Sequence, residues 1–221
     1  MAFEDYDEYE QGEQVRKWIR ENGIAVVVGV ALALALIFGW RQWQAHQANV
    51  AAQASSQFAV VQNAVQASNK QAMEAALGDL QKNYAKTPYA AFGSAAVAEY
   101  EVGKGDLKQA AQNLEWAGAH SKQPALQDLF SLRLARVLLA QGQAQAALAA
   151  IEKVPAGDFT ATAAELRGDA LFKLGKPDAA RTAYQDALAK LDKDAPGRNA
   201  VQMKLDNLTQ PQAASTGKQA Q

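Results

Sequence analysis

The chain has 221 residues and a formal net charge of −1, and it contains no cysteine. The lack of cysteine excludes disulfides and any catalytic or metal site built on thiolates. The first 41 residues hold 4 basic and 7 acidic residues, which leaves 18 basic and 16 acidic residues in the remainder. This balance argues against a nucleic-acid-binding surface. Much of the 49 % apolar content is alanine, the strongest helix former, so we predict an all-α protein.

Residues 1–21 are predicted to form an acidic cytoplasmic tail and an interfacial segment. The first stretch, MAFEDYDEYEQGEQ, has no apolar period, which is typical of a disordered or loosely helical tail. Val15, Trp18 and Ile19 then share one helix face, with basic residues around them. This pattern favours a short helix lying at a membrane interface.

Residues 22–42 are predicted to span a membrane. The run IAVVVGVALALALIFGW, from Ile24 to Trp40, contains no charged residue. As a helix it would be roughly 25 Å long, and adding Asn22 and Gly23 brings it close to the ~30 Å thickness of the hydrocarbon core. Trp18, Trp40 and Trp43 lie at the two ends, where amphipathic rings suit the interfaces. A buried core helix is the alternative, but it would carry one apolar stripe rather than apolar residues on all sides.

The charges beside this run predict its orientation. Arg16, Lys17 and Arg20 precede it, whereas Arg41 is the only basic residue after it until Lys70. The side richer in Lys and Arg is normally cytoplasmic, so we expect a single-pass type II protein whose C-terminal domain lies outside. In the inner membrane of a Gram-negative cell, that side is the periplasm. A cleaved signal peptide is the other alternative. The long acidic segment before the run and the length of the run favour an uncleaved anchor.

Residues 43–208 are predicted to form a helical repeat domain, and residues 209–221 a disordered tail. Residues 42–69 carry no charge and suit one long helix, with Phe58, Val61 and Val65 on one face. Further segments of about 12–16 residues follow, separated by turn-forming residues. The predicted breaks lie near residues 68–69, 86–88, 103–105, 121–124, 141–142, 155–157, 175–177 and 194–197. Residues 200–208, AVQMKLDNL, suit a final capping helix.

Small and bulky residues recur in this domain at a spacing of 33 to 37 residues. The last copy has Gly168, Leu171, Gly175, Ala180, Tyr184 and Ala187, and the copy before it has Ala135, Leu138, Gly142, Ala147, Ile151 and Val154. Two weaker copies include Ala98, Gly105, Ala110, Leu114 and Ala117, with Glu101 at an apolar position, and then Ala64, Ala76, Leu80 and Pro88. This is the pattern of tetratricopeptide repeats, in which stacked helix pairs bury one another. We expect three to four pairs; a generic alanine-rich bundle is the alternative.

The whole arrangement resembles the YfgM family of tetratricopeptide-like ancillary SecYEG translocon subunits. The resemblance rests on RENGIAVVVGVALALALIFGWRQW at 20–43, LRLARVLL at 132–139, ELRGDALFKLGKPDAARTAYQDAL at 165–188 and MKLDNL at 203–208. It implies a membrane-anchored periplasmic module that links polypeptides emerging from the translocon to chaperones such as the membrane-anchored PpiD. No catalytic residues come with the family, and we expect no enzymatic activity, cofactor or metal.

The first helix of each repeat is expected to line a concave surface that binds a partner. In the three better copies this face includes Phe92, Ala95, Glu99 and Val102, then Leu129, Leu132, Arg136 and Leu139, and then Thr162, Glu165, Asp169 and Phe172. We predict a partner-binding site at Leu132, Arg136, Leu139, Glu165 and Phe172, which would hold a chaperone or an unfolded client polypeptide. The C-terminal helix of the chain itself is the alternative occupant.

Two other functions stay open on the sequence. An envelope scaffold or stress-signalling adaptor would need no contact with translocating chains, and an inert surface would indicate a purely structural spacer. An enzyme is disfavoured because the two histidines, His46 and His120, lie far apart and no phosphate loop, HExxH or Gly-x-Ser-x-Gly motif is present.

Overall fold

The computed structural model describes residues 4–209, with side chains from residue 12 to 208, and all regular structure in that range is α-helical. The helices are α1 (Glu4–Gln66), α2 (Lys70–Asn83), α3 (Pro88–Lys104), α4 (Leu107–His120), α5 (Pro124–Ala140), α6 (Ala144–Ile151), α7 (Thr160–Lys173), α8 (Pro177–Lys190) and α9 (Arg198–Thr209). They divide into two units, Met1–Ala52 and Gln53–Gln221. The predicted all-α class is confirmed. The predicted C-terminal tail lies outside the described residues beyond Thr209.

The first unit is the long apolar part of α1. Helix begins at Glu4, so the described part of the acidic N-terminal segment is helical. The side chains from Ile24 to Trp40 are all exposed, which excludes the alternative that this run is a core helix of the chain itself. Residues 12–66 hold the one described helix that is long and apolar enough to cross a membrane. An exposed helix that is apolar on all sides suits lipid, as the sequence predicted.

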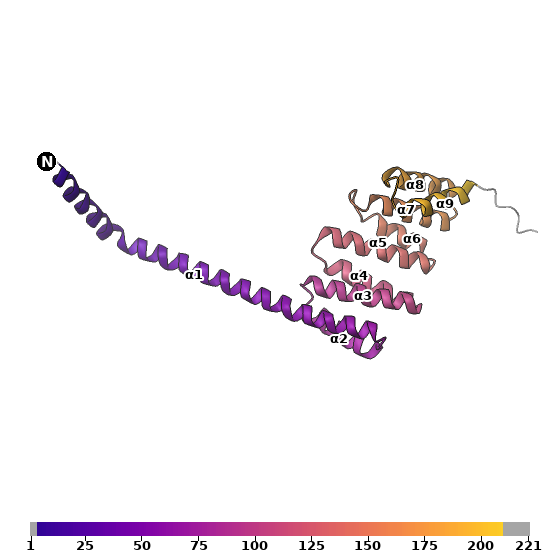
Figure 1. Cartoon of the computed structure of the whole chain (residues 1–221), viewed down its shortest axis with the longest axis horizontal. Helices are drawn as coiled ribbons and strands as arrows, with labels where there is room; N and C mark the ends of the chain where they lie inside the picture. The colour runs from indigo at the N-terminus through magenta and orange to yellow at the C-terminus, as the bar shows by residue number, and fades with distance from the viewer. Residues whose placement is uncertain (1–3, 210–221) are drawn as a thin grey trace, which may run out of the picture. The chain divides into compact units, whose positions relative to one another are not determined.

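The second unit is a stack of helix pairs (Figure 1). The turns of α1 from Gln53 onward pack with α2, and the next pairs are α3 with α4, α5 with α6, and α7 with α8. Helix α9 packs on α8 and ends the stack. The four pairs match the predicted repeats, and α9 matches the predicted capping helix.

Proline and glycine set the helix boundaries of these pairs. Pro88, Pro124 and Pro177 occupy the first turn of α3, α5 and α8, where the missing N–H is not needed. Three glycines with positive φ follow the first helix of a pair: Gly105 at 80°, Gly142 at 78° and Gly175 at 70°. A side chain with a Cβ rarely adopts this left-handed conformation, so these positions favour glycine. Every break predicted from the sequence lies at or beside a boundary between two helices of the structure.

Four apolar clusters hold the stack together, and consecutive clusters share one helix. The first joins α1, α2 and α3, the second α3, α4 and α5, the third α5, α6 and α7, and the fourth α7, α8 and α9. No single pair buries its own apolar face, so stability depends on neighbouring pairs. Most of the alanines of the repeat pattern lie where the helices approach closely: Ala98, Ala110, Ala117, Ala135, Ala147, Ala180 and Ala187 are at most 1 % exposed.

Glu101 departs from the repeat pattern, and the structure gives the physical reason. It lies on α3, half-buried, and its Oε2 accepts a hydrogen bond from Nδ2 of Asn113 on α4 at 2.9 Å. Asn113 is buried, so its amide needs this partner. Burial raises the pKa of Glu101; the bond from Asn113 opposes this rise and nearby Asp106 adds to it.

We expect Glu101→Gln to stabilise the domain at pH 7 by less than about 1 kcal/mol. Glutamine keeps an oxygen for Asn113 and removes the charge. A carboxyl whose folded pKa is raised favours folding most below its unfolded pKa and loses that contribution as the pH rises through the folded pKa. The gain should therefore vanish at about pH 4, where Glu101 is itself largely protonated. Urea unfolding at both pH values measures this, and a less stable variant at pH 7 would contradict the burial argument.

Candidate interaction surface

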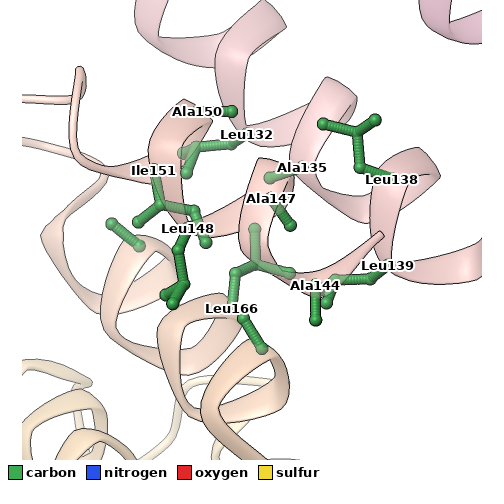
Figure 2. Close-up of a cluster of buried hydrophobic side chains, with 12 residues drawn as sticks. Leu132, Ala135, Leu138, Leu139, Ala144, Ala147, Leu148, Ala150, Ile151 and Leu166 are labelled. Atoms are coloured by element: carbon green, nitrogen blue, oxygen red, sulfur yellow. The ribbon is translucent and has the colours of Figure 1, made fainter. Parts of the chain in front are cut away.

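The five residues of the predicted binding site do not form one surface. Leu132 and Leu139 are 3 % and 6 % exposed and lie inside the cluster that joins α5, α6 and α7 (Figure 2). Their side chains pack against α6 and α7, so neither is free to contact a partner in this fold. The expectation that both face an open groove is wrong for the folded chain, because α5 is enclosed on that side by the next repeat.

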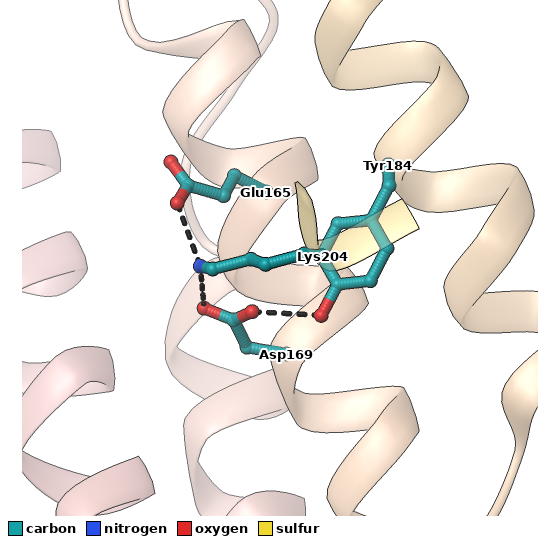
Figure 3. A network of polar contacts seen from close by, with 4 residues as sticks. All are labelled: Glu165, Asp169, Tyr184 and Lys204. Atoms are coloured by element: carbon teal, nitrogen blue, oxygen red, sulfur yellow. Dashed lines mark hydrogen bonds and ion pairs between the residues drawn. The ribbon is translucent and has the colours of Figure 1, made fainter. Parts of the chain in front are cut away.

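Glu165 is engaged by the chain's own C-terminal helix (Figure 3). Nζ of Lys204 on α9 donates to Oε1 of Glu165 at 2.7 Å and to Oδ2 of Asp169 at 2.8 Å. The hydroxyl of Tyr184 on α8 donates to the other oxygen of Asp169, Oδ1, at 2.8 Å. The network therefore ties α9 to both helices of the last pair. Glu165 pairs with Lys204, and Arg136 has no part in it.

The protonation states in this network suit a structural role. Burial alone would lower the pKa of Lys204, but its bonds to Asp169 and Glu165 outweigh burial and raise it. Burial, the bond to Asp169 and the two carboxylates together raise the pKa of Tyr184 far above its ordinary value. The lysine stays charged and the phenol stays neutral at physiological pH, so neither group is poised to transfer a proton.

Arg136 and Phe172 are the two predicted residues that remain exposed. Phe172 on α7 is 56 % exposed. Arg136 on α5 lines a groove of about 320 Å³ between α3 and α5. We call this the α3–α5 groove; its lining residues are Ala95, Ala98, Glu99, Val102, Leu114, Arg133, Arg136 and Val137.

The comparisons with known proteins match nearly the whole chain. A family model described as a tetratricopeptide repeat-like domain matches residues 16–210. The ancillary SecYEG translocon subunit of Escherichia coli (strain K12) is 34 % identical over 203 residues, which cover 92 % of this chain and 97 % of that protein. The protein of the same name from Haemophilus influenzae is 33 % identical over 211 residues, which cover 94 % of this chain and 100 % of that protein. The chain belongs to the YfgM family.

Membership in the YfgM family confirms the resemblance found in the sequence. A third relative, the ancillary SecYEG translocon subunit of Neisseria gonorrhoeae, is 32 % identical over 184 residues, covering 80 % of this chain and 87 % of that protein. Together with the long apolar helix near the N-terminus, the family makes this chain a membrane-anchored protein.

The α3–α5 groove of this YfgM-family chain was only partly foreseen. Ala95, Glu99, Val102 and Arg136 were predicted on one face of the first helices, and the structure brings them together. Arg133 was missed, although it lies three residues before Arg136 on the same helix face. The signal was available: Arg133 and Arg136 are the only charged residues in α5 after Asp128.

Proposed function

We propose that this protein is an ancillary subunit of the Sec translocon that presents a periplasmic repeat domain to chaperones and emerging polypeptides. The observation that carries the proposal is the full-length match to relatives named ancillary SecYEG translocon subunit, anchor and repeat domain included. A membrane helix would anchor the domain to the bilayer that also holds such a channel. Stacked repeats offer extended binding surfaces, and we infer a non-enzymatic role for them here.

The repeat domain contributes exposed groups of the kind that bind polypeptides. Phe172 and Val102 are exposed apolar side chains on the first helices of two pairs, and Arg136 lies in the α3–α5 groove. Exposed aromatic and arginine side chains are enriched where proteins contact one another. Of the predicted binding site, Arg136 and Phe172 are therefore the residues that we keep as partner contacts.

Co-purification of the tagged full-length chain from membranes in mild detergent tests this proposal. We expect the channel subunits to be retained together with a membrane-anchored chaperone of the PpiD kind. An unrelated single-pass membrane protein carrying the same tag is the control. Retention of the channel without a chaperone would remove the linking role. Retention of neither would favour the envelope scaffold or stress-signalling adaptor instead.

The orientation of the anchor follows from the basic residues before it. We expect a reporter that is active only in the periplasm to be active when fused after Leu208 and inactive when fused at the N-terminus. Replacing Arg16, Lys17 and Arg20 together with glutamine should reduce the activity of the C-terminal fusion, because the charge bias is then lost. Activity of the N-terminal fusion alone would reverse the orientation. A mature chain that begins near Ala48 would mean that the anchor is cleaved.

A further inference from the structure

The α3–α5 groove combines an apolar floor with two charged walls. Its apolar lining comes from Ala95, Ala98, Leu114 and Val137, and Val102 extends it outward at 43 % exposure. Glu99 lies on the α3 wall, and two arginines lie on the α5 wall. A second hollow, of about 390 Å³ between α4 and α5, has no such separation, because Glu115, Asp128 and Lys153 are mixed among its lining residues.

The groove has two arginines and one glutamate among its lining residues, so its net charge is positive. Within residues 12–208, neither Arg133 nor Arg136 forms an ion pair or a side-chain hydrogen bond, and Glu99 pairs with neither of them. Lys204 differs, because its charge is met by two carboxylates of the same chain. Two like charges three residues apart on one helix face repel each other, and a bound anion relieves that repulsion.

We propose that the α3–α5 groove docks a polypeptide segment in which a carboxylate side chain lies next to apolar ones. The carboxylate binds the guanidinium groups of Arg133 and Arg136, whose planar donors match both of its oxygens. The neighbouring apolar side chain covers the floor beside Val102 and is removed from water. The inference rests on the proposed function and adds to it the chemical class of segment that the domain selects.

Charge and shape together favour a polypeptide over a small anion. A free phosphate would use the arginines and leave the apolar floor in contact with water. An uncharged apolar segment would cover the floor and leave two unpaired arginines beside it, which costs solvation free energy. A basic segment would meet one carboxylate, Glu99 on the α3 wall, but would add a third positive charge beside the two arginines of the α5 wall. Only a segment that is both acidic and apolar satisfies both parts of the groove.

Fluorescence anisotropy on the full-length chain in zwitterionic nanodiscs tests the inference. The probe is a short labelled peptide of repeating Glu-Leu-Glu-Ala units, compared with one peptide with Lys for Glu and another with Ser for Leu. We expect the acidic apolar peptide to bind tightest and to weaken as salt is raised. Arg133→Gln with Arg136→Gln should weaken it by about tenfold, the loss expected for hydrogen bonds to a charged group.

Matched controls separate the groove from general charge. Arg167 and Lys173 are exposed on α7, and their double change to glutamine removes the same charge away from the groove. That variant should bind like the wild type, and circular dichroism should report both variants as folded. Equal binding of the acidic and basic peptides, or equal losses in the two double variants, would overturn the inference. So would displacement of the peptide by millimolar glycerol phosphate, which indicates a simple anion site.

The same proteins distinguish a failure of this inference from a failure of the proposed function. If the wild-type chain co-purifies with the channel but shows no preference for the acidic peptide, the inference fails and the proposed function stands. If the peptide binds through the two arginines but the chain never co-purifies with the channel, the proposed function fails and the chemistry of the groove stands.

Discussion

Leu139→Glu should unfold the repeat domain or bring it close to unfolding. Leu139 is 6 % exposed and lies within the apolar cluster that joins α5, α6 and α7 (Figure 2). The new carboxylate would be buried without a partner, at a cost of several kcal/mol that is comparable with the stability of a whole domain. Urea unfolding followed by circular dichroism measures the loss.

Ala140→Glu is the matched control for this change. Ala140 is the next residue on α5 and is exposed, so the same charge stays in water there. We expect a loss below about 1 kcal/mol, from the unfavourable position of an acid at a helix C-terminus. Equal stability of Leu139→Glu and wild type would contradict the burial of Leu139. It would support the binding role that the sequence predicted for this residue.

Gly168→Ala should also destabilise the domain, although alanine is the better helix former. A Cβ at this position would lie 2.5 Å from Cδ1 of Tyr184 and closer still to Cε1. Tyr184 is 3 % exposed and its hydroxyl is bonded to Asp169, so the ring has little freedom to move. Overpacking of this kind costs about 1–3 kcal/mol, which exceeds or cancels the gain of up to about 1 kcal/mol in helix propensity.

The preceding repeat suggests the compensating change. There Ala135 and Ile151 occupy the positions equivalent to Gly168 and Tyr184, and both are fully buried. Gly168→Ala combined with Tyr184→Ile should therefore be more stable than the sum of the two single changes predicts, as a double-mutant cycle would measure.

Gly78→Ala is the control for the single change. Gly78 lies exposed in α2, and a Cβ added there would meet nothing within 4 Å apart from its chain neighbours and the backbone of its own helix. The variant should therefore gain about 0.5–1 kcal/mol. A gain of the same size at Gly168 would contradict the close contact with Tyr184.

The fold could be predicted from the sequence because the signals that mark the beginning and end of each helix are local. Prolines begin three helices, glycines with positive φ follow the first helix of three pairs, and the apolar run near the N-terminus needs no partner to be recognised. The repeat spacing then predicts the stacking, since equivalent positions such as Ala135 and Gly168 must bury equivalent neighbours. These signals do not depend on which residues meet across the stack.

The binding surface could be predicted only in part, because it depends on contacts between distant residues. Helices α4, α6 and α7 pack against different sides of α5. Apolar residues therefore lie on several faces of α5, and their spacing does not indicate which face is exposed. For that reason the sequence pattern predicts Leu132 and Leu139 on the surface, whereas they are buried. The pairing of Lys204 with Glu165 joins residues 39 positions apart, and no local pattern indicates it.

Photo-crosslinking in intact membranes tests most directly whether the repeat domain contacts the translocon and its clients. A photoreactive amino acid replaces Val102, which is exposed in the α3–α5 groove, or Lys108, which is exposed on α4 outside that groove, in the full-length chain. We expect position 102 to crosslink to a channel subunit, a membrane chaperone or a translocating polypeptide, and position 108 to give none of these products. Identical products from both positions, or none from position 102 while the chain co-purifies with the channel, would contradict the groove as the contact surface.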